Sequence, residues 1–247
     1  MQQNIQLEVG GKPMDAFLAL PAEGKPLGGM IVGMEIFGVT PFVRRVATRL
    51  AELGYAALAP NFFYRYAPEL QLERDQSGRE RGLALTAQLQ RQEVLRDVQA
   101  SINELKGRGC AEVGMLGLSM GGHLAYLAAA ELPLRAVAVL YGGWLAGSPL
   151  IFAGGPPTLD LTPKMAQQNP FLLYLVGEAD HVVPPSDQQS LREALQAAVV
   201  RHEVVVYPDA PHGFFSDDAE TFRPAIQADA WARIEAMLRR ELARQQP

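Results

Sequence analysis

One short segment of the sequence has the residue types that nucleophilic chemistry needs. In Val113-Gly-Met-Leu-Gly-Leu-Ser-Met-Gly-Gly-His, an apolar run leads into Gly117-Leu-Ser-Met-Gly, with glycines two positions before and after Ser119. A strained turn from a buried strand into a helix would hold the serine hydroxyl above the sheet, and glycines remove Cβ atoms that would collide with neighbouring elements. The pattern predicts that Ser119 is a nucleophile and that the helix beginning at Met120 directs its first N–H groups at a developing oxyanion.

The alternative interpretation of this segment is a glycine-rich turn that binds phosphate, as in dinucleotide-binding folds. That turn needs Gly-x-Gly-x-x-Gly spacing, which the residues around Ser119 do not have. A bare Gly-x-Ser-x-Gly is only moderately specific, so a nucleophile also needs an acid and a base elsewhere in the chain.

Candidates for both roles follow two later predicted strands. Asp180 comes shortly after the apolar run Phe171–Val176, and His212 comes shortly after Glu203–Tyr207. Open α/β sheets place their ligand chemistry beyond the carboxyl ends of the strands, so we expect both side chains near Ser119. The order serine, acid, histidine is that of an α/β-hydrolase, in which the histidine takes the serine proton and the acid fixes the imidazole tautomer.

Other residues compete for these roles. Glu178 and Asp209 are alternative acids in the same two loops, although such carboxylates are commonly solvated. Among the other histidines, we expect His202 at the surface, His123 packed or partly exposed on the helix after the serine, and His181 at the rim of the pocket. No pair of histidines has the spacing of metal ligands, so no metal is predicted.

The elements that hold these residues alternate between strands and helices after an antiparallel start. Ile5–Val9 and Met14–Leu20 predict a hairpin around Gly10-Gly11-Lys12. Further buried strands are expected at Met30–Met34, Tyr55–Ala59, Val113–Leu118, Ala136–Tyr141, Phe171–Val176 and Glu203–Tyr207. Helices are expected at Phe42–Leu53, Leu83–Leu105 (as one helix or two), Met120–Leu132, Pro185–Val199 and Phe222–Leu242. The pattern predicts an α/β-hydrolase fold: a mostly parallel, doubly wound sheet with an antiparallel N-terminal hairpin and no separate lid domain.

The segment Gly142–Pro170 is rich in glycine and proline, which predicts an irregular structure, and it is expected to shape the rim of a pocket.

At 247 residues, we expect the whole chain, 1–247, to form a single α/β-hydrolase domain. The net charge of -5 provides no basic field for nucleic acid or an anionic membrane, so neither partner is expected. The one cysteine, Cys110, cannot form an internal disulfide and is expected to be buried. No signal peptide or membrane span is visible, which favours a cytoplasmic protein; the oligomeric state is not predicted.

With these positions assigned, the chain resembles the dienelactone hydrolase family, the small lidless α/β-hydrolases that include carboxymethylenebutenolidase. The resemblance runs from Met14 to Leu238. It rests on Met34-Glu-Ile-Phe-Gly-Val39, Gly54-Tyr-Ala-Ala-Leu-Ala-Pro60, the serine turn, Gly177-Glu-Ala-Asp180 and His212-Gly-Phe214. It implies a small-molecule ester or lactone substrate, no cofactor, and an oxyanion hole formed by the backbone N–H groups of Ile36 and Met120. It also implies that Glu35 lies beside the nucleophile; the plainer interpretation of Glu35 is a carboxylate at a helix entry.

The sequence departs from the family's best-known pattern in two ways. That pattern has a cysteine nucleophile where this chain has Ser119, and a hydroxyl depends on a general base more than a thiol does, so the role of Glu35 stays open. Dienelactone-cleaving members also bind the substrate carboxylate with arginines, one of them four residues after the histidine, where this chain has Ser216.

An arginine from the loop after Pro60 could still bind a substrate carboxylate. Arg81 or Arg79 is the nearest match, and Arg65 is another candidate, although arginines in loops are usually solvated. The absence of an arginine at position 216 argues against dienelactone as the substrate and favours a carboxylesterase of broader specificity.

We therefore expect a serine hydrolase of this family that cleaves a small ester or lactone through an acyl-enzyme. The alternative within enzymes is a general carboxylesterase or thioesterase for uncharged acyl groups. The alternative from another class is a non-catalytic α/β-hydrolase-like module that binds a ligand or a protein. A binding module has no physical need for a serine, an acid and a histidine in this order, which argues against it.

Overall fold

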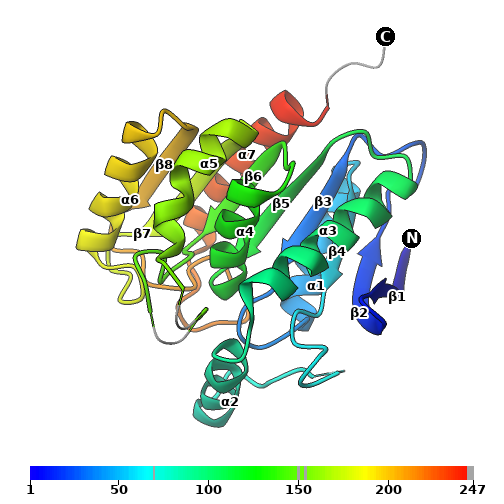
Figure 1. Ribbon diagram of the computed structural model, residues 1–247, viewed down its shortest axis with the longest axis horizontal. Coiled ribbons are helices and arrows are strands. Elements are labelled where there is room, and N and C mark those ends of the chain that lie inside the picture. Colours follow the sequence, from blue (N-terminus) through cyan, green and yellow to red (C-terminus); the bar gives the residue numbers. More distant parts are fainter. Residues whose placement is uncertain (69, 149–150, 153–154, 244–247) are drawn as a thin grey trace.

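The computed structural model describes residues 1–68, 70–148, 151–152 and 155–243, and its strands form one sheet in the order β1-β2-β4-β3-β5-β6-β7-β8 (Figure 1). The strands are β1 (Gln2–Val9), β2 (Lys12–Ala19), β3 (Gly29–Gly33), β4 (Ala56–Pro60), β5 (Val113–Leu118), β6 (Ala136–Leu140), β7 (Phe171–Gly177) and β8 (Arg201–Tyr207). β2 is antiparallel to β1 and β4, and the neighbours from β4 to β8 are parallel. The predicted fold class, a mostly parallel sheet with an antiparallel N-terminal hairpin, is confirmed.

Helices cover both faces of this sheet. The helices of the described part are α1 (Pro41–Glu52), α2 (Gln76–Thr86), α3 (Arg91–Gly107), α4 (Met120–Glu131), α5 (Thr162–Gln168), α6 (Pro185–Ala197) and α7 (Pro224–Glu241). Of these, α2 projects below the sheet in Figure 1 and covers neither face. In Figure 1, α3 and α4 lie in front of the sheet, whereas α1 and α7 lie behind it. This division follows from the strand order, because successive right-handed crossovers change face when the chain reverses its direction across the sheet. β3 to β6 are buried along their whole length, which explains their continuous apolar sequences.

The structure decides one prediction that was left open, and it differs from the prediction in one other segment. The helix expected over Leu83–Leu105 is two helices, and α2 begins at Gln76, where the side chain of Asp75 accepts a hydrogen bond from the Gly78 N–H at 2.7 Å. The segment expected to be irregular contains a 3₁₀ turn at Thr158–Leu161 followed by α5, and its residues 149–150 and 153–154 lie outside the described part. α5 is only seven residues long and begins with a proline, so the sequence offers too few turns for a periodic pattern.

Among the described residues, we find no helix with the length and apolar content that a membrane-spanning segment requires.

The imidazole of His123 ties α4 to the segment that follows β6. His123 is 1% exposed, its Nδ1 lies 2.9 Å from the Gly143 carbonyl oxygen, and its Nε2 lies 2.7 Å from Thr158 Oγ1. Burial lowers the pKa of His123 from 6.5 to about 4, because desolvation disfavours the charged ring. Of the two positions expected for His123, packed or partly exposed, the structure has the packed one, and the side chain joins Gly143 and Thr158 to α4.

The lowered pKa of His123 predicts a loss of stability in acid. The unfolded chain binds a proton near pH 6.5, whereas the folded chain binds it only near pH 4. This stabilising contribution is present in full above the unfolded pKa and is lost as the pH falls toward the folded pKa, with a slope of up to about 1.4 kcal/mol per pH unit. Urea unfolding of wild type and His123→Asn between pH 7 and pH 4.5 measures it. The variant is expected to start less stable and to lose less stability in acid; parallel curves would contradict the assignment.

Candidate active site

Ser119 occupies the turn between β5 and α4 in a backbone conformation that side chains rarely adopt. Its φ is 52° and its ψ is -112°, outside the regions preferred by L-residues. The Ser119 N–H donates to the Leu140 carbonyl at 3.0 Å, and the Gly121 N–H donates to the Met34 carbonyl at 3.0 Å. These bonds fasten the turn to β6 on one side and to the segment after β3 on the other.

The glycines of this turn are required by the close approach of α4 to the sheet. A Cβ at Gly117 would overlap the carbonyl of Gly121, and a Cβ at Gly121 would overlap the carbonyl of Gly33. The nearest atoms at both positions belong to the backbone, so no neighbouring side chain could move aside to relieve the overlap. The sequence motif therefore reflects a packing requirement as well as the position of a hydroxyl.

The structure brings Ser119, His212 and Asp180 into one hydrogen-bonded series. Ser119 Oγ lies 2.9 Å from His212 Nε2, and His212 Nδ1 lies 2.9 Å from Asp180 Oδ2. Asp180 is buried, and its Oδ1 accepts the N–H groups of Val182 at 2.8 Å and Val183 at 3.1 Å. These two donors fix the direction of the carboxylate, which suits it to orient an imidazole.

The competing acids lie elsewhere. Glu178 is exposed, and its Oε2 accepts the Asp209 N–H at 3.3 Å. This hydrogen bond joins the loop after β7 to the loop after β8. Asp209 is exposed as well, in a left-handed conformation with φ of 53°. His181 lines the same cavity as Ser119, as expected from the sequence, and its ring centre lies 5.9 Å from that of His212.

Tyr141, at the end of β6, packs against the imidazole. Its ring is edge-on to His212 at 4.9 Å and to Phe214 at 5.2 Å between centres. Its hydroxyl is buried and has no hydrogen-bond partner in the described part of the chain. Burial raises the pKa of Tyr141 well above its ordinary value. Tyr141 thus fixes the imidazole through apolar contact.

A cavity of about 500 Å³ opens beside the serine. Among its lining residues are Glu35, Ile36, Phe37, Arg74, Arg79, Leu83, Ser119, Trp144, His181, Val182, His212, Gly213, Asp218, Ala219, Glu220 and Thr221. Ile36 is therefore at the cavity wall, and Met120 directly follows Ser119 as the first residue of α4, whose N–H has no acceptor within the helix. Trp144 comes from the segment that the sequence predicts as a pocket rim.

Glu35 lies in this wall and belongs to a charged cluster. It is 4% exposed and forms an ion pair with Arg74, which also donates from Nη2 to Ser216 Oγ at 2.6 Å. Arg74 Nε lies 2.8 Å from Asp218 Oδ1, and Ser216 Oγ donates to the same oxygen at 3.2 Å. Burial raises the pKa of Glu35 above its ordinary value, although the Arg74 ion pair opposes that shift.

Arg74 was not among the arginines that the sequence suggests. Of those, Arg79 lines the cavity, whereas Arg81 is exposed on α2 and is not among the described lining residues. Arg65 forms an ion pair with the buried Asp97, in which Arg65 Nη1 lies 2.7 Å from Asp97 Oδ2. No sequence signal distinguishes Arg74, because an arginine in a polar loop usually points to water.

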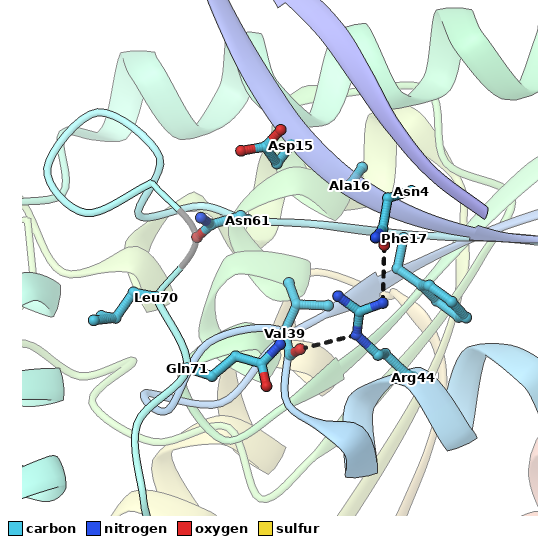
Figure 2. A pocket seen from close by; sticks show the side chains of 9 residues that line it. All are labelled: Asn4, Asp15, Ala16, Phe17, Val39, Arg44, Asn61, Leu70 and Gln71. Atoms are coloured by element: carbon cyan, nitrogen blue, oxygen red, sulfur yellow. Dashed lines mark hydrogen bonds between the residues drawn. The ribbon is translucent and has the colours of Figure 1, made fainter.

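Figure 2 shows a second hollow, of about 340 Å³, between the N-terminal hairpin and the start of α1. Arg44 crosses it and donates from Nη1 to Asn4 Oδ1 at 2.9 Å and from Nε to the Val39 carbonyl at 3.4 Å. Its described lining has no serine, cysteine or histidine and shares no residue with the Ser119 cavity. Of these two hollows, the one beside Ser119 contains the serine and the histidine of the hydrogen-bonded series. Within the described ranges, no group of three or more metal-ligating side chains is arranged to hold an ion.

Comparison with known proteins assigns the family. The family model described as "Dienelactone hydrolase family" matches residues 14–242. This chain belongs to the dienelactone hydrolase family. A Synechocystis sp. protein named "Putative carboxymethylenebutenolidase" is 32% identical over 243 residues, which are 97% of this chain and 94% of that protein. An Escherichia coli protein of the same name is 31% identical over 230 residues, 91% of this chain and 81% of that protein.

A solved structure supports the same assignment. The crystal structure described as "Putative Dienelactone Hydrolase from Klebsiella pneumoniae" is 28% identical and superimposes with a TM-score of 0.85, covering 96% of this chain and 97% of that chain. The resemblance stated from the motifs is therefore confirmed. As a dienelactone hydrolase family member, the chain is a hydrolase that acts on ester or lactone bonds.

The tight approach at the serine turn predicts a large difference between two Gly→Ala variants. Gly121→Ala places a methyl group against the Gly33 backbone, and we expect a loss of about 3 kcal/mol or more in unfolding free energy. Gly107→Ala, at the exposed end of α3, meets nothing within 4 Å and is expected to gain up to about 1 kcal/mol. Urea unfolding of both compares the two sites. Equal stability of the two variants would show that the turn can relax.

The unpartnered hydroxyl of Tyr141 predicts that its removal does not destabilise the fold. Tyr141→Phe keeps the ring and deletes a buried polar group without a partner, so its unfolding free energy should equal or exceed that of wild type by up to about 1 kcal/mol. Tyr141→Ala deletes the ring and should lose about 3–5 kcal/mol. A destabilised Phe variant in thermal or urea unfolding would mean that the hydroxyl is hydrogen-bonded in solution.

Proposed function

We propose that this hydrolase cleaves a small ester or lactone through an acyl-enzyme on Ser119. The observation that carries the proposal is the hydrogen-bonded series from Ser119 through His212 to the buried Asp180. In the tautomer that this geometry favours, His212 Nδ1–H donates to Asp180, and Nε2 accepts the Ser119 hydroxyl proton. The imidazole is then a general base for the serine and a general acid for the leaving group.

The reaction proceeds in two halves. Ser119 Oγ attacks the carbonyl carbon, and the tetrahedral oxyanion is stabilised by the backbone N–H groups of Ile36 and Met120, with the N-terminus of α4 adding to the field. The intermediate collapses when the alcohol leaves with the proton from His212; in a lactone the alcohol stays tethered to the acyl group. Water, deprotonated by His212, then attacks the acyl-enzyme and releases the acid.

A second candidate, a carboxylesterase for uncharged acyl groups, is favoured by one specific observation. Ser216 occupies the place where dienelactone-cleaving members have an arginine, and Arg74, which reaches it, is already paired with protein carboxylates. Recognition of a substrate carboxylate needs a guanidinium that is free to pair with it.

The mechanism predicts complete dependence on the Ser119 hydroxyl. Hydrolysis of 4-nitrophenyl acetate should fall by roughly 10³-fold or more in Ser119→Ala, because the other parts of a triad cannot replace the nucleophile. Intact-mass measurement during turnover should show an acetylated wild-type species that the variant lacks. Ser190→Ala, on the exposed side of α6, is a matched control and should retain the wild-type rate and adduct.

Equal rates in wild type and Ser119→Ala, with no adduct in either, would overturn the nucleophile assignment. That result would favour the binding-module interpretation of the same cavity.

A further inference from the structure

The cavity beside Ser119 has more acidic than basic side chains. Its lining includes three carboxylates, those of Glu35, Asp218 and Glu220, and two guanidiniums, those of Arg74 and Arg79. A substrate carboxylate binds well only to a guanidinium whose charge and N–H groups are not already engaged by other carboxylates. The partners of the two arginines therefore decide which substrates the cavity accepts.

Arg74 is engaged on two sides. It forms the ion pair with Glu35, and its Nε lies 2.8 Å from Asp218 Oδ1. Its guanidinium carbon lies 4.9 Å from the centre of the Phe37 ring, so an aromatic surface covers one face, and the side chain is 23% exposed. Two carboxylates thus share the single positive charge of Arg74.

The other guanidinium, that of Arg79, is more exposed to solvent. Arg79 is exposed on α2, and Glu220, also exposed, lines the same cavity. Water and salt screen charges in such positions, so a contact with Arg79 contributes little to substrate affinity. The guanidinium with the better desolvated position is Arg74.

We propose that Asp218 is a specificity-determining residue that holds Arg74 away from the substrate, so that the cavity selects esters and lactones without a carboxylate. This inference rests on the proposed function of the same cavity. Asp218 is the carboxylate that can be removed selectively, because Glu35 is buried beside the nucleophile whereas Asp218 lies in the loop after His212. Without Asp218, the Nε N–H of Arg74 and part of its charge become available to a ligand.

The experiment compares a matched substrate pair, 4-acetoxybenzoate and its methyl ester, which differ in one charge remote from the scissile bond. Wild type should have the higher kcat/KM for the methyl ester. Asp218→Asn should raise the ratio of anionic to neutral kcat/KM by about tenfold, the effect of one charge-assisted hydrogen bond. The double variant Asp218→Asn with Arg74→Gln should lose that gain.

Two neighbouring variants separate release of Arg74 from a general loss of negative charge. Asp217→Asn changes the adjacent residue, which shares Arg45 with Asp218 and is not among the described lining residues. Because Asp217 has no described contact with Arg74, its ratio should stay close to that of wild type. Glu220→Gln removes a charge from the cavity wall but removes no described contact of Arg74, and its ratio should rise less than that of Asp218→Asn. An equal rise in Glu220→Gln would overturn the specific role of Asp218.

If Asp218→Asn does not fold, Asp218→Ser replaces it. A second experiment needs no variant, because it measures inhibition of the wild-type enzyme by a neutral and an anionic ligand. Benzamide should inhibit methyl-ester hydrolysis more strongly than benzoate, and the reverse order would overturn the proposal. An unchanged substrate ratio in the Asp218 variants, with hydrolysis that still depends on Ser119, would refute the role of Asp218 alone. Hydrolysis that survives Ser119→Ala would refute the proposed function instead.

Discussion

The N-terminus of α4 packs directly on the backbone of the sheet, and the geometry around Ser119 depends on this approach. The helix can come so close only where neither partner carries a Cβ, at Gly33, Gly117 and Gly121. The approach turns the chain so sharply that Ser119 takes a positive φ, a conformation that costs about 1–3 kcal/mol. Burial of β5 and its neighbours on both faces offsets this cost and prevents the turn from relaxing.

The same constraint fixes the wall of the cavity. Because the Gly121 N–H donates to the Met34 carbonyl, the segment that continues into Glu35 and Ile36 has a set position relative to the serine. That position buries the Glu35 carboxylate, and a buried charge needs a partner of opposite sign. Arg74 supplies it from a distant segment of the chain. A packing requirement in the backbone therefore leads to a charged cluster in the wall of the Ser119 cavity.

The sequence predicted the elements whose patterns are long and local. The buried strands could be read from continuous apolar runs, and the meeting of Ser119, Asp180 and His212 followed from placing each after a parallel strand. The identity of the arginine could not be predicted, since Arg74 reaches Glu35 through the path of a loop without periodicity. The separation of α2 from α3 was left open for a similar reason: Ala87–Gln90, between the two helices, has neither proline nor glycine to mark a stop.

The loop after β8 links the proposed base to the charge of the cavity. Phe214 and Phe215, which follow His212, are fully buried, and Phe215 packs 5.3 Å from Trp231 of α7 between ring centres. These anchors fix His212 at one end of the loop and Asp218 at the other. Ser216 and Asp218 of this loop both contact the Arg74 guanidinium, which comes from the segment before α2. A single anchored loop thus positions both the His212 imidazole and the Asp218 carboxylate that contacts Arg74.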